Sequence, residues 1–314
     1  MLIDAIVADR LRMRVPSARI VCLGLSALDV VWRVETLFGG GSEKIRADGH
    51  EALGGGMAAT AAVTIARLGG NAAFWGRGGT DAAGEQMRTE LMAEGVDVEQ
   101  FRLFPDGRSS ISGIMVDANG ERQIVNFRGS FPEAADWLPL EKVVHASAAL
   151  ADPRWVAGAK ALFTMARDNN VPTILDADMA EQEVFEVLLP LADHAIFSSP
   201  ALERFQPIPT EAALERISSY GCRVAAVTRG AEGVVWRQSG SLHEMRAQTV
   251  DIVDTTGAGD VFHGAYALAV GAGLCPQHAM SFASAAAAIK CTRPGGRAGI
   301  PSLADCLAFK GSSQ

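Results

Sequence analysis

The sequence reads DTTGAGD at positions 254–260 and continues as VFHGAYALAVGAG to position 273. The small residues at 257–259 bury little surface, so packing does not explain them, but they allow backbone amides to approach a ligand closely. The residues that follow predict a helix, whose free N–H groups and positive dipole end suit a phosphate. Asp260 falls in the first turn, where its carboxylate can accept a proton from a hydroxyl. An anion hole beside a base is the minimum apparatus for phosphoryl transfer to an alcohol.

A simpler explanation of this stretch is a turn followed by a helix in which Asp254 or Asp260 is only a cap. That explanation suffices for a lone GAG sequence, whereas the full seven residues before a helix of small residues favour a catalytic role. The other common phosphate-transfer patterns, GxxxxGK[ST], HRD and DFG, do not occur in the sequence.

Composition limits the possible functions. The 314 residues are 48% hydrophobic and carry a net charge of -8 without a long basic run, which argues against a nucleic-acid partner. No apolar run approaches the ~20 residues that a membrane span requires. The five cysteines are odd in number and show no CxxC spacing, which indicates reduced thiols and a cytoplasmic protein.

The order of predicted elements indicates an α/β fold. A strand at 19–25 opens the main domain, and from 146 onward strands alternate with helices, which predicts a mostly parallel central sheet with helices on both faces. Alternating runs at 110–116 and 122–127 around Asn119-Gly120 predict a hairpin. We expect residues 1–18 to be an N-terminal extension and 19–314 one domain, with segments near 30–52 and 109–130 forming a small β lid.

The sequence resembles the PfkB, or ribokinase-like, family of sugar kinases from about residue 19 to 303. The resemblance rests on DTTGAGD, on GLSALDVVWRVE (24–35), on GGMAATAAVTIARLG (55–69) and on VTRGAEG (227–233). It implies an ATP-dependent sugar kinase in which Asp260 is the base and the amides of Gly257, Ala258 and Gly259 form the anion hole. It also implies sugar contacts at Asp29, Gly55, Gly56 and Thr60, and nucleotide contacts at Thr228, Gly230, Gly233, Thr256 and Gly295.

The resemblance implies ATP and Mg²⁺ as cofactors, and the sequence departs from the family pattern at one position expected to face the sugar and at one element expected to recruit magnesium. Thr60 stands where the family usually has an asparagine, and Ser199-Pro200-Ala201-Leu202 stands where it has the NxxE element that helps to recruit magnesium. The residues that would hold Mg²⁺ therefore stay unassigned. The family often holds a monovalent cation such as K⁺ on backbone carbonyls, here those of the loop around 293–299. Lys290, Arg293 and Arg297 fit either the edge of a nucleotide site or a solvated loop.

Within the family, longer stretches such as MVDANGERQIVNF (115–127) and ADPRW (151–155) most resemble the sulfofructose kinases. That resemblance implies transfer to O1 of 6-deoxy-6-sulfofructose. Lys44, Asn126 and Arg154 are then candidates for binding the sulfonate, because together they offer two cations and an amide.

Other functions stay open at this point. The substrate could be another ketose or a ribose-like sugar, and the missing NxxE residues also fit a non-catalytic sugar or nucleotide sensor. A dinucleotide enzyme is suggested only by the glycines at 54–56, which do not form GxGxxG. His263 either packs in the core or touches the base. Family lids often pair between subunits, which implies a homodimer through the lid.

Overall fold

The computed structural model describes residues 3–42 and 44–309. The main sheet has the strand order β13-β12-β11-β10-β9-β8-β1-β4-β5, parallel except that β12 runs antiparallel to both β11 and β13. Its strands are β1 (Arg19–Gly24), β4 (Asn71–Gly79), β5 (Phe101–Phe104), β8 (Ala148–Ala151), β9 (Thr173–Ala177), β10 (His194–Ser198), β11 (Val224–Thr228), β12 (Val234–Gln238) and β13 (Ser241–Met245). The mostly parallel sheet predicted from the sequence is confirmed.

Helices cover both faces of this sheet because successive strand residues point to opposite sides. In β1, Ile20 and Cys22 contact one hydrophobic core, and Val21 and Leu23 contact the other. The first core includes α1 (Ala5–Arg14), α2 (Met57–Arg67), α3 (Ala82–Ala93), α8 (Ala258–Gly271), α9 (Pro276–Cys291) and α10 (Leu303–Ala308). The second includes α4 (Val156–Asp168), α5 (Gln182–Leu188), α6 (Ser199–Phe205) and α7 (Thr210–Ser218).

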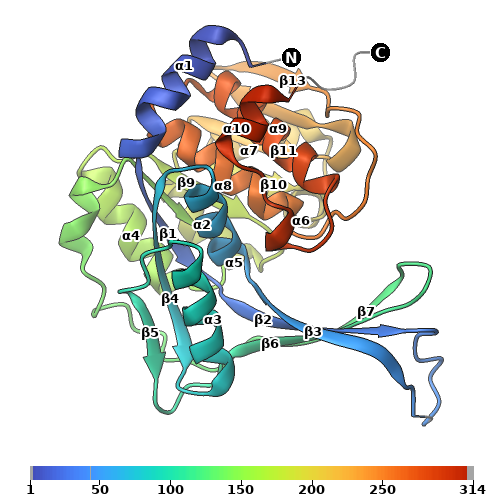
Figure 1. Cartoon of the computed structure of the whole chain (residues 1–314). Helices are drawn as coiled ribbons and strands as arrows, with labels where there is room; N and C mark the ends of the chain where they lie inside the picture. Colours follow the sequence, from blue (N-terminus) through green and yellow to red (C-terminus); the bar gives the residue numbers. More distant parts are fainter. Residues whose placement is uncertain (1–2, 43, 310–314) are drawn as a thin grey trace.

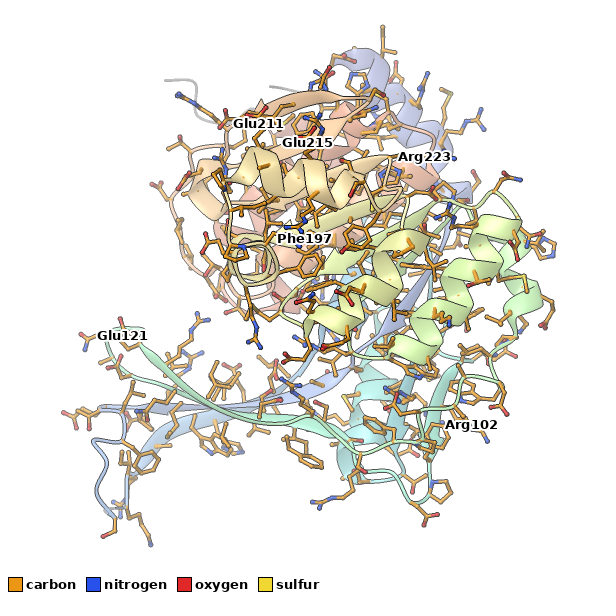
Figure 2. All side chains as sticks on the ribbon, turned by 180° about the vertical axis from the view of Figure 1, so that it is seen from behind. Arg102, Glu121, Phe197, Glu211, Glu215 and Arg223 are labelled. Atoms are coloured by element: carbon orange, nitrogen blue, oxygen red, sulfur yellow. The ribbon has the colours of Figure 1, made fainter. Side chains whose placement is uncertain are left out.

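A second sheet projects from one end of the body as a lid (Figures 1 and 2). Its strand order is β3-β2-β6-β7, with β2 parallel to β6 and the other pairs antiparallel. The strands are β2 (Ala27–Val34), β3 (Ala47–Gly55), β6 (Ser110–Val116) and β7 (Arg122–Phe127). Figure 2 shows Glu121, in the turn between β6 and β7, at the far end of the lid. The predicted hairpin has the observed bounds, whereas β2 and β3 extend beyond the predicted segment 30–52.

The predicted N-terminal extension contributes to the main core. Helix α1 buries Val7 and Leu11, and Val15 follows in a short 3-10 helix, all in the same core as Ile20 of β1. Asp4 caps the helix by accepting a hydrogen bond from the amide of Val7 at 2.8 Å. The boundary at residue 18 therefore marks the start of the sheet and not the edge of the hydrophobic core.

The strand order places a crevice at the carboxyl ends of β1 and β8. From β1 the chain builds outward to β4 and β5, then crosses to the other side of β1 and continues with β8 and β9. In open α/β sheets ligands bind where the strand order reverses in this way, outside the carboxyl ends of the strands. Asp152 follows β8 directly, and the lid begins just after β1.

Candidate active site

The turn before α8 has the backbone geometry of an anion site. Gly257 is the N-cap residue and has a φ of +76°, a left-handed conformation that favours glycine. The Asp254 carboxylate accepts a hydrogen bond from the Thr256 amide at 2.9 Å, which shapes the turn. The amide of Ala258 is already bonded to the carbonyl of Thr255 at 3.1 Å, so the predicted anion hole has its open donors further into the first turn.

Space is left open above this turn. A Cβ built on Gly259 would meet no heavy atom within 4 Å, and one on Gly257 would approach only Thr60 and Asp260, at 3.7 and 3.8 Å. The glycine at 259 is therefore not required by contacts within the protein. Its absent side chain makes room for a ligand at the start of α8.

Asp260 belongs to a cluster of carboxylates around His263. Burial and the nearby charge of Asp176 raise the pKa of Asp260 well above its usual range, and Asp178 adds to the effect. Asp176, which is 2% exposed, also has a raised pKa through burial and the charges of Asp152 and Asp178. A carboxylate with a raised pKa is a stronger base once ionised, which suits proton abstraction near neutral pH.

His263 is buried and holds the α8 turn against the main sheet. Its Nδ1 lies 2.8 Å from the carbonyl oxygen of Gly259 and 3.4 Å from Oδ1 of Asp176, and its Nε2 lies 3.2 Å from the carbonyl oxygen of Ile196. Of the two alternatives left open by the sequence, these contacts support the packed histidine. The ring packs in the core, and it contacts the turn and the carboxylate next to Asp260.

A nucleotide-sized pocket of about 480 Å³ lies beside the turn. It contains the predicted residues Thr228, Gly230, Gly233 and Gly259, together with Ala258. Residues that the sequence analysis did not select complete the lining: Gln248, Val250 and Ile252 in the segment after β13, and Ala287, Ala288 and Cys291 on α9. The sequence gives little reason to select these residues, because small and apolar residues on a loop or a helix most often serve only packing.

Asp29, Gly55, Gly56 and Thr60 meet where the lid joins the body. A Cβ on Gly55 would lie 2.2 Å from Oδ2 of Asp29, and one on Gly56 would lie 2.5 Å from the carbonyl oxygen of Leu25. Gly55 therefore allows β2 and β3 to approach closely, and Gly56 allows the start of α2 to approach the segment between β1 and β2. Burial raises the pKa of Asp29, although a hydrogen bond with Ser112 and the charge of Arg297 oppose the shift.

Arg297 also belongs to this group. Its Nη2 donates to the carbonyl of Gly55 at 2.7 Å and its Nε to Thr60 Oγ1 at 3.3 Å, while Nη1 is buried without a hydrogen-bond partner. Burial lowers its pKa to about 10. The sequence is compatible with Arg297 at the edge of a nucleotide site or in a solvated loop. The side chain instead reaches the glycines of the predicted sugar site.

A larger cavity of about 990 Å³ lies between the carboxyl ends of the strands and the lid. It contains Asn126 on β7, Ser112 on β6 and Arg154 after β8, as well as two arginines that the sequence analysis missed, Arg77 and Arg128. Asn126 donates to Ser112 Oγ at 3.1 Å. Arg77 could have been selected from the sequence, because it is the one charged residue in the buried strand NAAFWGRGG.

Arg154 and Lys44 differ in their positions. Arg154 donates to the carbonyl of Met179 at 2.5 Å and lies 3.5 Å from Oδ2 of Asp178. Lys44 is exposed in the loop between β2 and β3 and is not among the residues that line the cavity. Within one chain the structure therefore brings Asn126 and Arg154 together, but not Lys44.

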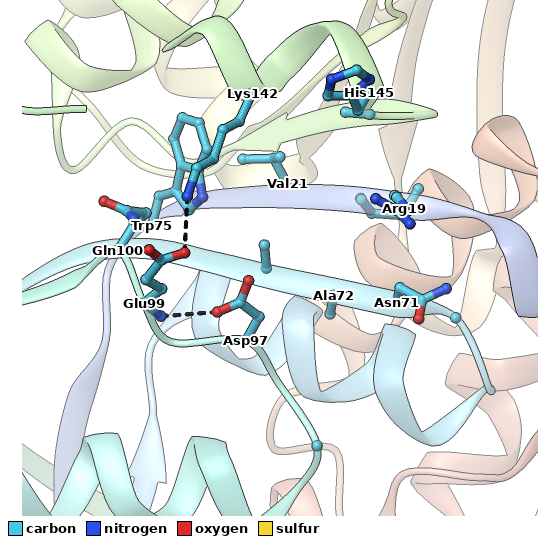
Figure 3. Close-up of a pocket in the computed structure, with 15 residues that line it drawn as sticks. Arg19, Val21, Asn71, Ala72, Trp75, Asp97, Glu99, Gln100, Lys142 and His145 are labelled. Atoms are coloured by element: carbon cyan, nitrogen blue, oxygen red, sulfur yellow. Dashed lines mark hydrogen bonds and ion pairs between the residues drawn. The ribbon is translucent and has the colours of Figure 1, made fainter. Parts of the chain in front are cut away.

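Another hollow, of about 420 Å³, lies near the amino ends of β1 and β4, on the side of the main sheet away from the crevice (Figure 3). It includes Arg19 and Asn71, the first residues of β1 and β4, and a surface ion pair between Lys142 and Glu99 at 2.9 Å. Because these are the amino ends of the strands, the hollow is remote from the turn before α8 and plays no part in the site.

Each cavity is lined by a residue near the carboxylate cluster. Gly259, adjacent to Asp260, faces the nucleotide-sized pocket, and Asp178 faces the larger cavity. This arrangement is that of an enzyme which brings a phosphate group to an acceptor held under a lid.

Comparison with known proteins identifies the family of enzymes to which the chain belongs. The model of the pfkB family of carbohydrate kinases matches residues 17–303. The chain belongs to this family and is an ATP-dependent sugar kinase.

Several relatives agree with this assignment. A fructokinase of Vibrio alginolyticus is 30% identical over 82% of this chain and 91% of its own length. A crystal structure of a candidate ribokinase from Agrobacterium tumefaciens has a TM-score of 0.85 at 34% identity, covering 92% of this chain and 96% of that one. Arabidopsis thaliana ribokinase complexed with ribose and ATP has a TM-score of 0.82 at 25% identity, covering 93% and 99%. The dinucleotide alternative is thereby excluded.

Kinases of this family use ATP with Mg²⁺, but the residues at the expected magnesium element do not fit that ion. The Ser199 hydroxyl donates to the carbonyl of Thr228 at 3.1 Å, Leu202 is buried, and Glu203 is exposed. Among residues 3–42 and 44–309, no group of three or more His, Cys, Asp or Glu side chains is arranged to hold a metal. No helix in that part of the chain is long and apolar enough to cross a membrane.

Proposed function

We propose that this kinase phosphorylates O1 of 6-deoxy-6-sulfofructose, with Asp260 as the general base. The observation that carries the proposal is the larger cavity under the lid, where Asn126 and Arg154 share one space with Arg77 and Arg128. A sulfonate is a permanent anion with three acceptor oxygens, so removing it from water requires cations and several donors. Guanidinium groups and an amide supply both.

The proposed reaction uses the groups around the turn before α8. The sugar lies near Asp29, Gly55, Gly56 and Thr60, and Asp260 removes the proton of the attacking hydroxyl as the γ-phosphoryl group of ATP transfers in line. Amides in the first turn of α8, around Gly257 and Gly259, stabilise the negative charge on that group. Kinases of this family use ATP with Mg²⁺, which when bound would supply counter-charge to the ATP phosphates.

The test is a panel of acceptors assayed by coupled ADP release: 6-deoxy-6-sulfofructose, fructose 6-phosphate, fructose and ribose. The proposal requires the highest kcat/KM for the sulfonated sugar, with phosphate found on O1 of the product. Fructose 6-phosphate is the demanding competitor, because it carries more charge on a longer ester link. A higher kcat/KM for any other sugar in the panel would contradict the proposal.

A neutral ketose is the second candidate, because Arg154 is already engaged by Asp178 and Met179 in the protein itself. A sulfonate would have to compete with Asp178 for the guanidinium, whereas fructose would leave that pair intact. The fructokinase relative supports the same candidate.

We extend the proposal to the cellular location and the oligomeric state of the enzyme. We expect the enzyme to work in the cytoplasm, which its five unpaired cysteines support. We also expect a homodimer formed through the lid, because apolar side chains of the lid sheet such as Trp32, Ile124 and Val125 are exposed. Sedimentation of the purified chain measures this, and a monomer at assay concentration would contradict it.

A further inference from the structure

Lys290 is a fully buried cation that the proposed mechanism does not use. It lies in the last turn of α9, and its side chain has an exposed fraction of 0%. Lysine is almost never fully buried unless its ammonium group is paired, because the charge loses its hydration. The contacts of the ammonium group therefore indicate why the residue is there.

Each of the three N–H donors of Lys290 has an acceptor. The Nζ atom lies 2.9 Å from the carbonyl oxygen of Asp254, 3.4 Å from the carbonyl oxygen of Arg293 and 3.4 Å from Oδ2 of Asp254. An ammonium group has three donors and no acceptor, so this set satisfies it. The end of a helix adds to the effect, because its carbonyls carry partial negative charge.

These contacts join two segments beside the nucleotide-sized pocket, whose lining includes their neighbours Thr255 and Cys291. Asp254 begins the turn before α8, and Arg293 begins the loop that leads to Arg297 and the sugar site. The carbonyl of Cys291 strengthens the same junction by accepting hydrogen bonds from the amides of Val253 and Asp254, at 2.8 and 3.1 Å. Lys290 thus fixes the turn to the end of α9.

The carboxylate of Asp254 compensates the positive charge of the Lys290 ammonium group. Although burial acts in the opposite direction, hydrogen bonds from Thr256 and the charge of Lys290 lower the pKa of Asp254. From the lid, Arg122 lies 3.5 Å from Oδ1 of Asp254. Arg293 is directed away, to Asp305 at 3.2 Å. Asp254 therefore remains the counter-charge of Lys290 over the neutral pH range.

Carbonyl oxygens that converge on one point form the usual site of a monovalent cation. The resemblance to the family predicted such a cation at this loop, yet the carbonyls of Asp254 and Arg293 already bind an ammonium group. A second cation on the same oxygens would be repelled by it. We propose that Lys290 replaces the monovalent cation in this kinase and positions the phosphate turn, so that the enzyme needs no K⁺.

This inference rests on the kinase activity and does not depend on which sugar is phosphorylated. The experiment compares wild type, Lys290→Ala and Lys290→Met in tetramethylammonium, sodium, potassium and ammonium chloride at matched ionic strength. The two readouts are ATP turnover with any accepted sugar and the Tm without sugar. Lys142→Ala is the matched control, because it removes an exposed ammonium group from a surface ion pair.

We expect wild-type turnover and Tm to be the same in potassium and tetramethylammonium, within about twofold for turnover. Lys290→Ala opens the carbonyl site, so it should lose at least ~10-fold of its turnover in tetramethylammonium and regain most of it in potassium or ammonium. Its Tm should rise with the same two ions, because they bind the folded state. In Lys290→Met the side chain fills the site without charge, and no ion should restore it.

Three results would overturn the inference. The first is a wild-type enzyme that potassium activates tenfold or more. The second is Lys290→Ala with normal turnover in tetramethylammonium. The third is a folded Lys290→Ala whose lost turnover no cation restores. If the alanine variant does not fold, the wild-type comparison still decides, and an unknown sugar preference leaves the Tm measurement intact.

Discussion

The two cavities beside the carboxylate cluster are built in different ways. The nucleotide-sized pocket is lined largely by glycines, alanines and apolar side chains, such as Gly259, Ala288 and Ile252, and by no charged residue of the described chain. The larger cavity is lined by long charged side chains, such as Arg77 and Arg154, from segments far apart in the sequence. A cavity lined by charged side chains can change its specificity through single substitutions, whereas an apolar pocket without charged residues offers fewer such positions.

Substitution of the proposed base gives the largest expected effect. Asp260→Asn retains the shape of the side chain but cannot accept the proton, so kcat should fall by at least ~10³-fold while ATP binding and folding persist. Turnover and ATP binding should be measured together, with the exposed Asp251→Asn as control. Near-normal turnover of the folded variant would remove Asp260 from the mechanism.

Specificity at the charged cavity is tested by Arg154→Ala. Loss of the guanidinium should cost about 2–4 kcal/mol in kcat/KM for 6-deoxy-6-sulfofructose, because a buried anion loses its partner. The kcat/KM for fructose should change far less. The measured quantity is the ratio of these two losses, and a ratio near one would show that Arg154 does not bind the sulfonate.

The nucleotide-sized pocket is tested by Gly259→Val. The added side chain meets open space in the protein, so the Tm should change little, whereas it would occupy the position of a phosphate and lower kcat/KM by roughly 100-fold. Gly257→Val is the informative companion, because a φ of +76° makes that change costly for the fold as well. An active Gly259→Val enzyme would show that the phosphates do not approach this residue.

The smallest effect concerns Asp176 and has a defined direction with pH. Its pKa is raised above the ordinary value of 3.8 in the folded chain, so the folded state holds the proton more tightly than the unfolded state. Stability therefore falls as pH rises from about 4 through the raised pKa. Asp176→Asn should raise the Tm at neutral pH by a few degrees and flatten its pH dependence.

The same variant also reports on Asp260. Removing the charge of Asp176 lowers the pKa of Asp260, so the rise of kcat/KM with pH should move to lower pH. Asp178→Asn, on the same strand end but more exposed, provides a comparison. If the profile of Asp176→Asn coincides with that of wild type, Asp176 does not influence the base.

The sequence predicted the elements whose cause is local. The helix after Asp260, the hairpin of β6 and β7 and the alternation from residue 146 onward each follow from a pattern of neighbouring residues. The pocket residues Thr228, Gly230, Gly233 and Gly259 were found for the same reason, since a glycine-rich turn has a short signature.

The charged groups could not be placed in the same way, because their partners come from distant segments. Arg297 contacts Gly55, and Arg77 reaches the cavity from β4, while Lys44 lies in a lid loop away from the cavity in its own chain. For Lys290 the sequence showed a lysine near a loop, and only the fold shows that Asp254, 36 residues earlier, satisfies its charge. Charge alone does not reveal which lysine is buried.

Asp152, at the carboxyl end of β8, has a consequence for how the chain folds. Its carboxylate accepts hydrogen bonds from the amides of Leu25 and Ala58, which lie 127 and 94 residues away, and from that of Arg154. Bonds between such distant residues close long loops and form slowly. The crevice between β1 and β8 is therefore complete only once segments from the whole first half of the chain have been brought together.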